Sequence, residues 1–298
     1  MSIKRRIVGG LNNILSPFDI TVSRKSEIDD LREFYGKARH HSFKKSQLPK
    51  GASDYLNNNN ERLKKLKRRY LNFDFPVTTH SIWQQKRLRY EIDIQYFRGD
   101  NAYIFQKRAG NRAAQYFLTA YYIKTIDFLG MLDNLSEDNL FGIDTYNFNG
   151  KNTLSRDLLD SIVEMYFLID TIKLHQMKNI NILDIGAGYG RFCHRAWFQF
   201  PEIATIFSTD AIAESTFLSE FYLSYRKVDE KNRVIPLDEV QGLLTDHHID
   251  LATNIHSFSE CPLDAIGWWL DNLQDNGTRY LMIVPNASDH EGLSRCPR

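Results

Sequence analysis

The sequence predicts an α/β fold, with a doubly wound parallel sheet over residues 151–298 and a mostly helical, basic region over residues 1–150. Three observations predict it. Beyond residue 181, short apolar segments alternate with amphipathic segments at the rhythm of strands and helices. The first of these strands runs directly into a glycine-rich turn. The region before it shows helical spacing without sustained β alternation. We therefore expect a sheet domain preceded by a helical region that caps the substrate site or serves in oligomerisation.

Two helices are predicted in detail, one over residues 61–71 and one that begins after Ser155. Residues 61–71 put Leu63, Leu66 and Tyr70 on one helix face and basic residues on the opposite face. A long amphipathic helix follows Ser155, whose side chain suits an N-cap. The other N-terminal segments are a helix near residues 27–38, loops at 48–53 and 57–60, and a helical, aromatic stretch over 81–132.

Five strands with helical crossovers are expected in the C-terminal region. The strands are predicted at residues 182–185, 205–210, 234–237, 250–255 and 279–285. Helices are predicted between them at 191–200, 213–226 and 263–273. Parallel strands joined in this way form a doubly wound sheet, which binds ligands at the carboxyl ends of its strands, near the point where the strand order reverses.

The turn after the first strand carries the strongest functional signal. Gly186, Gly188 and Gly190 recur at every second position, and Asp184 precedes them. The dinucleotide fingerprint would require glycine where this chain has Arg191, so the spacing speaks against NAD or FAD. Glycines let a ligand approach the backbone, and the following helix points its positive end at the same place. These groups suit a ligand that carries both an ammonium and a carboxylate.

This D-x-G-x-G-x-G pattern resembles motif I of the class I S-adenosylmethionine-dependent methyltransferases. The resemblance implies a Rossmann-like sheet and S-adenosyl-L-methionine as the cofactor. Asp210 follows the second strand, 24 residues after Gly186, and is expected to accept from both ribose hydroxyls. It could also simply N-cap the helix that begins near Ala213. The cofactor site is expected to comprise Asp184, Gly186, Ala187, Gly188, Tyr189, Gly190, Asp210, Ala211, Asp238 and Asn254.

Three further segments, residues 97–106, 155–161 and 250–260, together with Trp268 and Trp269, resemble the sugar O-methyltransferases. The resemblance implies methyl transfer to a hydroxyl of a sugar or glycosylated substrate. Carbohydrate sites combine aromatic faces with planar polar groups. The expected substrate residues are Trp83, Asp100, Asn101, Tyr103 and Gln106, although aromatic residues at helical spacing more often pack in a core.

Methyl transfer to a hydroxyl needs a base, and the predicted fourth strand ends beside one. His256 lies at its carboxyl end, where this fold places groups near the substrate, and an imidazole pKa near 6.5 suits the task. Glu260 is the second choice, as the base or as the group that orients His256. A loop-bracing role for His256 stays open. His247 and His248 precede the strand and are discounted.

Other functions remain open from the sequence. Methyltransferases that act on base amines resemble one another in a D/N-P-P-Y/F motif, and this chain has Asn-Ile-His-Ser over residues 254–257, which argues against amine methylation. A methyltransferase for RNA ribose or for another small molecule survives that test. So does a non-catalytic module that only binds the cofactor.

Charge is distributed unevenly along the chain. Residues 1–120 hold 24 of the 38 Lys and Arg but 11 of the 37 Asp and Glu, a formal charge of +13; the remaining 14 bases and 26 acids give −12. The basic half could face nucleic acid, anionic lipid or a phosphorylated substrate. It could also pack on the acidic half or on a second copy of the chain in a homodimer. Because charge blocks seldom have a dedicated partner, nucleic acid is not favoured.

Composition indicates a soluble, globular, cytoplasmic protein. Cys193, Cys261 and Cys296 have neither metal nor disulfide spacing, so no metal is expected and a reducing compartment is favoured. No stretch approaches the roughly 18 apolar residues of a membrane span. The methyltransferase resemblance implies two more strands than the chain has room for after residue 285. We expect either a family that omits them or a truncated chain with an exposed edge strand.

Overall fold

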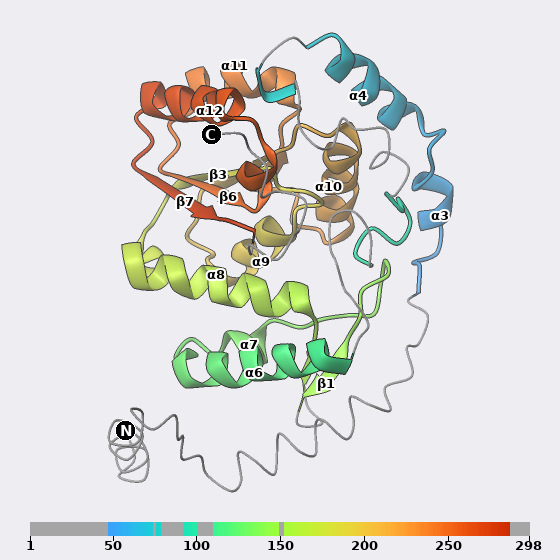
Figure 1. Ribbon diagram of the computed structural model, residues 1–298, viewed down its shortest axis with the longest axis vertical. Helices are drawn as coiled ribbons and strands as arrows, with labels where there is room; N and C mark the ends of the chain where they lie inside the picture. The colour runs from blue at the N-terminus through green and yellow to red at the C-terminus, as the bar shows by residue number, and fades with distance from the viewer. Residues whose placement is uncertain (1–46, 74–75, 79–91, 100–109, 149–151, 287–298) are drawn as a thin grey trace, which may run out of the picture.

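A computed structural model describes residues 47–73, 76–78, 92–99, 110–148 and 152–286. Its centre is a five-stranded sheet in the order β5-β4-β3-β6-β7, and all four strand pairs are parallel. The strands are β3 (Asn181–Ile185), β4 (Thr205–Thr209), β5 (Asn232–Val234), β6 (Leu251–Ile255) and β7 (Tyr280–Val284). The predicted doubly wound parallel sheet is confirmed. Its strand order reverses at β3, because β4 and β6 lie on its two sides (Figure 1).

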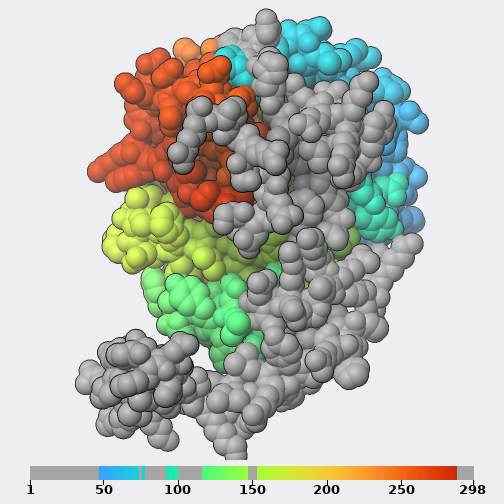
Figure 2. Space-filling model, in the orientation of Figure 1, coloured from blue at the N-terminus to red at the C-terminus, as the bar shows by residue number. Residues whose placement is uncertain are grey.

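Helices cover both faces of this sheet. On one side lie α8 (Arg156–Ile172), α9 (Arg191–Gln199) and α10 (Ala213–Tyr225), and on the other lie α11 (Val240–Asp246) and α12 (Leu263–Asn276) (Figure 1). Short 3-10 turns occur at η4 (Leu174–Gln176), η5 (Leu237–Glu239) and η6 (Ser257–Glu260). Figure 2 shows α12 and β7 at one end of the visible face, α8 next to them, and the green N-terminal helices beyond α8.

Alternation along the strands produces the two hydrophobic layers. Ile182 and Leu251 are paired across β3 and β6 and pack with α8, α9 and α10. Leu183 and Ala252, one residue further along, face the opposite way and pack with α11 and α12. The central strands β3 and β6 are therefore buried on both sides, whereas the edge strands β5 and β7 are partly exposed.

Two predicted boundaries differ from the structure for clear reasons. The third strand runs over Asn232–Val234 and shares only Val234 with the predicted 234–237, because Pro236 has no N–H to donate to the ladder and the chain turns into η5. The last helix continues to Asn276 and ends at Gly277, whose φ of 74° forms a left-handed C-cap. The N-cap is confirmed for α8, where the Ser155 hydroxyl accepts from the Leu158 N–H.

The described N-terminal part contains helices of 4 to 17 residues and one pair of antiparallel strands. Its elements are α3 (Ala52–Tyr55), α4 (Glu61–Leu71), η2 (Pro76–Thr78), α6 (Gly110–Ile126), α7 (Met131–Asn134), β1 (Tyr146–Phe148) and β2 (Asn152–Leu154). In α4, Leu63 and Leu66 are buried as predicted, and α4 packs along α10. The antiparallel β1–β2 hairpin was not expected from the helical spacing. The helix predicted near residues 27–38 lies outside the described residues.

The basic face of α4 pairs with acids of the C-terminal half. Arg62 forms a two-pronged ion pair with Glu220 of α10. Lys67 lies 2.7 Å from Glu214. Arg69 donates to both oxygens of Asp238 at 2.8 and 2.7 Å, and also to Glu239. Part of the positive charge of the N-terminal half is thus paired with acids of the C-terminal half within the same molecule. This is one of the alternatives that the sequence left open.

A buried ionic cluster joins the N-terminal part to the sheet domain. The Arg98 side chain is fully buried and lies 2.8 Å from Glu137, 3.1 Å from Asp138 and 3.8 Å from Asp157. Arg195 of α9 pairs with the same Glu137 at 2.7 Å. Burial alone would raise the pKa of Glu137, but Arg98 and Arg195 outweigh it and lower the pKa to about 2.

The described residues also bear on two further questions, a membrane span and a metal site. None of their helices has the length and apolar character that a membrane span needs. Among the same residues, no cluster of three or more His, Cys, Asp or Glu side chains is arranged to hold a metal ion. β7 lies at the end of the sheet, with Ile283 half exposed on it.

Candidate functional site

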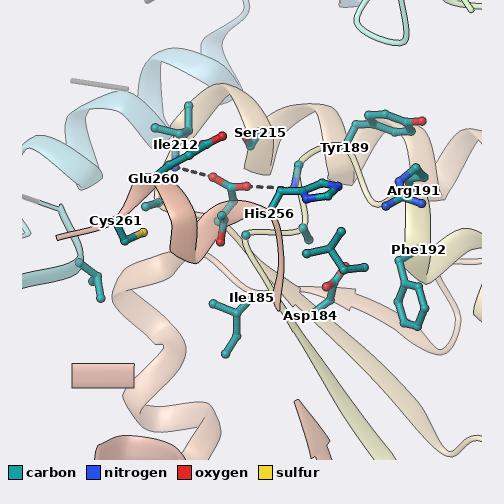
Figure 3. A pocket seen from close by; sticks show the side chains of 18 of the residues that line it. Asp184, Ile185, Tyr189, Arg191, Phe192, Ile212, Ser215, His256, Glu260 and Cys261 are labelled. Carbon is teal, nitrogen blue, oxygen red and sulfur yellow. Dashed lines mark hydrogen bonds between the residues drawn. The ribbon is translucent and has the colours of Figure 1, made fainter. Parts of the chain in front are cut away.

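A cavity lies at the carboxyl ends of β3, β4 and β6, at the point where the strand order reverses. Its walls come from the glycine loop (residues 186–190), the start of α9, residues 210–215 and the β6 loop (residues 256–261) (Figure 3). The sheet therefore places the cavity where a doubly wound fold binds its ligands.

All three glycines of the loop have the left-handed backbone that favours glycine, with φ of 73° at Gly186, 58° at Gly188 and 85° at Gly190. At Gly186 a β-carbon would lie 2.2 Å from the Ser257 hydroxyl oxygen, so this glycine lets the β6 loop touch the glycine loop. At Gly190 it would lie 3.0 Å from Ser219 of α10. Gly188 meets nothing within 4 Å, so open space lies in front of its backbone.

Asp210 ties this loop to the end of β4. Its Oδ2 accepts from the Gly188 N–H at 2.9 Å, and its Oδ1 accepts from the Ile212 N–H at 2.8 Å. Burial raises the pKa of Asp210 to about 7, with a further contribution from Glu260, although these N–H donors and the Ser215 hydroxyl act to lower it. These three donors leave the carboxylate with capacity to accept a further hydrogen bond from a ligand hydroxyl.

Asp184, at the end of β3, also lines the cavity and is almost fully buried. Thr253 donates to its Oδ1 at 2.7 Å, and the Cys193 thiol lies 3.4 Å from its Oδ2. Burial raises the pKa of Asp184, against the effect of these two donors and of Arg191. The carboxylate is held in one orientation, and a ligand cation would lower its pKa.

The N-terminus of α9 lies at the edge of the cavity. The N–H groups of its first turn have no partners within the helix, and the helix dipole is positive there. The Arg191 guanidinium donates to Glu164 at 2.8 and 2.9 Å and to the Ser161 hydroxyl at 2.8 Å. Glu164 thus keeps Arg191 charged and occupied. We infer that the helix terminus, rather than this side chain, is available to a carboxylate.

One wall of the cavity is apolar. It includes Val77 of η2, Ile212, Trp269 of α12 and Cys261. Burial raises the pKa of the Cys261 thiol to about 12, helped by Glu260 and Asp210, so the thiol is uncharged at neutral pH. This wall adjoins Asp210, and a flat aromatic ring can pack on it.

His256 faces the cavity from the β6 loop with a φ of 70°. Its Nδ1 lies 3.3 Å from the carbonyl oxygen of Pro285. Since a carbonyl only accepts, Nδ1 carries the proton and Nε2 carries the lone pair. Burial lowers the pKa of His256, and Arg191 and Arg156 lower it further against the effect of Asp160. The imidazole is therefore neutral at pH 7 and able to take up a proton.

Glu260 lines the cavity on the side of Ile212 and Ser215, whereas Arg191 lies on the other side, beyond His256 (Figure 3). The Glu260 Oε1 accepts a hydrogen bond from the Asn286 side-chain amide at 3.1 Å. Its charge contributes to the raised pKa of Asp210, which places Glu260 at the Asp210 end.

The cavity brings together most of the residues predicted from the sequence. Those that line it are Asp184, Gly186, Ala187, Gly188, Tyr189, Asp210, Ala211, His256 and Glu260. The Tyr189 hydroxyl points away from the cavity and donates to Asp157 (Figure 3). Gly190, Asp238 and Asn254 lie outside the lining. Asp238 is bound to Arg69, so a cofactor contact from it stays a prediction.

Asn254 has a structural position next to the cavity. Its amide donates to the Ile185 carbonyl at 3.0 Å and to the Ser257 hydroxyl at 2.6 Å, and its carbonyl accepts from the Phe258 N–H. It thereby pins the first half of the β6 loop to β3. The five substrate residues predicted from the sequence lie outside the described residues.

Sequence reasoning missed several lining residues. Arg191 directly follows Gly190, so the motif itself could have indicated it, whereas Ser215 lies in the first turn of α10, four residues after Ala211. The sequence indicates Trp269 only as part of the family resemblance, and not as a residue of the site. Val77 comes from a turn more than 100 residues before the glycine loop, and no local pattern marks it.

No protein family model and no curated protein matches this chain. Among solved structures, it is similar to M. capricolum TrmK in complex with S-adenosyl-homocysteine, at 14% identity and a TM-score of 0.29, over 39% of this chain and 51% of that one. It is also similar to StiE O-MT residues 961–1257, at 18% identity and a TM-score of 0.31, over 42% of each chain. A third is a SAM-dependent methyltransferase from Thiobacillus denitrificans in complex with S-adenosyl-L-homocysteine, at 20% identity and a TM-score of 0.23, over 28% of this chain and 33% of that one.

The alignment spans about half of the TrmK chain. At these TM-scores the similarities carry no weight for activity or substrate. The fold and the site rest on the geometry of this chain.

Proposed function

We propose that this protein is an S-adenosylmethionine-dependent methyltransferase that acts on a hydroxyl of a sugar or glycosylated substrate. One observation carries the proposal. The glycine loop, tied to Asp210 at 2.9 Å, forms one side of a cavity into which a neutral His256 also faces. A cofactor cradle and a candidate base therefore share one space.

The residues of the cavity fit this cofactor. Asp184 would hold its ammonium group, and the first turn of α9 would hold its carboxylate. Asp210 would accept from the ribose hydroxyls, and the apolar wall with Trp269 would cover the adenine. The open space in front of Gly188 leaves room for a ligand against the backbone. When bound, S-adenosylmethionine supplies an electrophilic methyl group with a neutral thioether as the leaving group.

The protein's own contribution is to orient the acceptor and remove its proton. The Pro285 carbonyl fixes the Nδ1–H tautomer of His256, so that Nε2 is the atom that accepts the hydroxyl proton. Burial, with a smaller contribution from Arg191 and Arg156, lowers the pKa of this imidazole and keeps it neutral at the start of the reaction. Asp160, which opposes that effect, would stabilise the imidazolium once it forms.

The acceptor assignment rests on the sequence resemblance and on the need for a base. A sugar hydroxyl has a proton that must be removed during transfer, and a neutral imidazole in the cavity meets that need. The predicted aromatic and polar substrate residues belong to the same proposal.

The test is incubation with labelled S-adenosylmethionine and extracts of host glycans or lipid-linked oligosaccharides. We expect label in a glycan with the wild-type protein. His256→Ala should bind S-adenosylhomocysteine normally and lose about 10²- to 10⁴-fold in turnover, the range for a general base. His248→Ala is the control, because His248 lies more than half exposed before β6, 3.2 Å from the Asn276 carbonyl. Label in RNA would contradict the sugar assignment, and full activity of His256→Ala would remove His256 from the mechanism.

A further inference from the structure

The β6 loop is closed against the segment that follows β7. The His256 N–H donates to the Val284 carbonyl at 2.7 Å, and the His256 ring lies 3.3 Å from the Pro285 carbonyl. Two residues after Val284, the Asn286 N–H donates to the Ser259 hydroxyl at 3.0 Å. These contacts run along the length of the loop, from its first residue to its last turn.

The two halves of this loop are held by different asparagines. Asn254 binds the first half, through Ser257 and Phe258, from inside the fold. Asn286 binds the second half from the outer side, because its amide donates to Glu260 Oε1 at 3.1 Å in addition to the backbone bond to Ser259. The second half has no β ladder of its own, since η6 is a single 3-10 turn.

The loop needs such support for two reasons. His256 has a left-handed backbone, a conformation that a side chain with a β-carbon adopts only when its surroundings impose it. Glu260 lies at the Asp210 end of the cavity, where the two carboxylates repel each other. A hydrogen bond from an amide to the Glu260 carboxylate opposes that repulsion and keeps Glu260 in the lining.

We propose that Asn286 is a positioning residue that closes the β6 loop onto the end of β7 and so fixes His256 and Glu260 at the cavity. The inference rests on the proposed function, because it gives Asn286 a role at the site of the candidate base. Asn286 itself acts through these two residues and through Ser259.

The test is a titration of His256 in ¹⁵N-histidine-labelled protein, with its signal assigned from the spectrum of His256→Gln. In the wild type we expect a pKa below the ordinary 6.5 and a protonated Nδ1. Asn286→Ala keeps the backbone hydrogen bonds of the loop but removes the amide that holds Glu260. We expect the loop to loosen, the pKa of His256 to rise toward 6.5 and the tautomer preference to weaken. The charged groups near the ring, Arg191, Arg156 and Asp160, are unchanged in this variant.

Calorimetry with S-adenosylhomocysteine gives the second measurement. Asn286→Ala should bind it about threefold to tenfold more weakly, the loss expected for one hydrogen bond. The control is Asn272→Ala, whose amide donates to the Trp268 carbonyl within α12, away from the loop. It should change neither the titration nor the affinity.

The role of Asn286 and the proposed function can fail independently in these experiments. If wild-type protein fails to bind S-adenosylhomocysteine, the proposed function fails, while the His256 titration still decides the role of Asn286. An unchanged His256 pKa and tautomer in folded Asn286→Ala would overturn the inference. If that variant does not fold, Ser259→Ala removes the acceptor of the Asn286 N–H, and the same shift is expected. Wild-type titration behaviour in Ser259→Ala would then overturn it.

Discussion

Asp210 Oδ2 accepts a hydrogen bond from the Gly188 N–H at 2.9 Å, between the ends of the neighbouring strands β4 and β3. The carboxylate proposed to bind the ribose therefore also shapes the loop proposed to bind the methionine end. One acid therefore links both ends of the proposed cofactor site.

The affinity for S-adenosylhomocysteine should depend on pH through Asp210. Burial raises the pKa of this carboxyl to about 7 in the free protein, and ribose hydroxyls donate best to its ionised form. Affinity should therefore rise as pH rises, by about tenfold between pH 6 and pH 8, as the ionised fraction grows. Calorimetry across this range measures it.

Asp210→Asn is the control for that pH dependence. It should bind weakly at every pH and lose the trend. Stability provides an independent check, because the folded protein holds this proton to a higher pH than the unfolded chain does. The contribution of Asp210 to the free energy of unfolding should thus fall as pH rises from about 4 to about 7, and the variant should lack this slope. Wild-type affinity that is highest at pH 6 would contradict the assignment.

The glycines should differ in the cost of adding a methyl group. Gly186→Ala combines a left-handed backbone with a β-carbon 2.2 Å from Ser257, and should lower the free energy of unfolding by about 2–5 kcal/mol. Gly188→Ala meets open space and should lose only about 1–2 kcal/mol from backbone strain. Gly242→Ala, in an exposed turn of α11 without positive φ, should be neutral or stabilising by up to about 1 kcal/mol. Urea denaturation ranks the three, and equal losses at Gly186 and Gly188 would be inconsistent with the close contact.

The buried ionic cluster should be sensitive to loss of its cation. Arg98→Met leaves Glu137 with one cation and takes away the cation that lies 3.8 Å from the buried Asp157, and should cost about 3–5 kcal/mol of stability. Arg156→Met removes an i,i+4 pair with Asp160 that is partly exposed, and should cost no more than about 0.5 kcal/mol. Chemical denaturation compares the two. A loss at Arg98 as small as that at Arg156 would show that the cluster is not held as described.

The cations of α4 should be coupled to the acids of α10. A double-mutant cycle with Arg62→Ala and Glu220→Ala should give a coupling of about 0.2–1 kcal/mol, because the pair is two-pronged but partly exposed. The coupling should shrink at high salt. A coupling of zero at low salt would mean that Arg62 is free to serve another partner.

Local sequence carried enough information for the sheet and the glycine loop. Strands buried on both faces show as short apolar runs, and the left-handed turns of the loop require glycine at fixed positions. Asp184 and Asp210 could be found because each lies directly after or at the end of a strand, and these two strands, β3 and β4, are consecutive in the chain as well as adjacent in the sheet.

The rest of the site depends on contacts between distant segments. Val77 reaches the cavity from a turn before the sheet domain, and Asn286 reaches Glu260 only because β7 pairs with β6. The acids that pair with Arg98 come from two other segments of the chain, so the residues around Arg98 in the sequence do not indicate that it is buried. The partner of Asp238 could not be read from the chain either, since Arg69 lies 169 residues before it.

The most direct measurement is calorimetric titration of the wild-type protein with S-adenosylhomocysteine, with NAD as the comparison. We predict one binding site per chain with a dissociation constant between about 1 and 100 μM, and no binding of NAD. Absence of heat and of saturation with S-adenosylhomocysteine in a folded sample, or equal binding of NAD, would contradict the assignment of this cavity to an S-adenosyl cofactor.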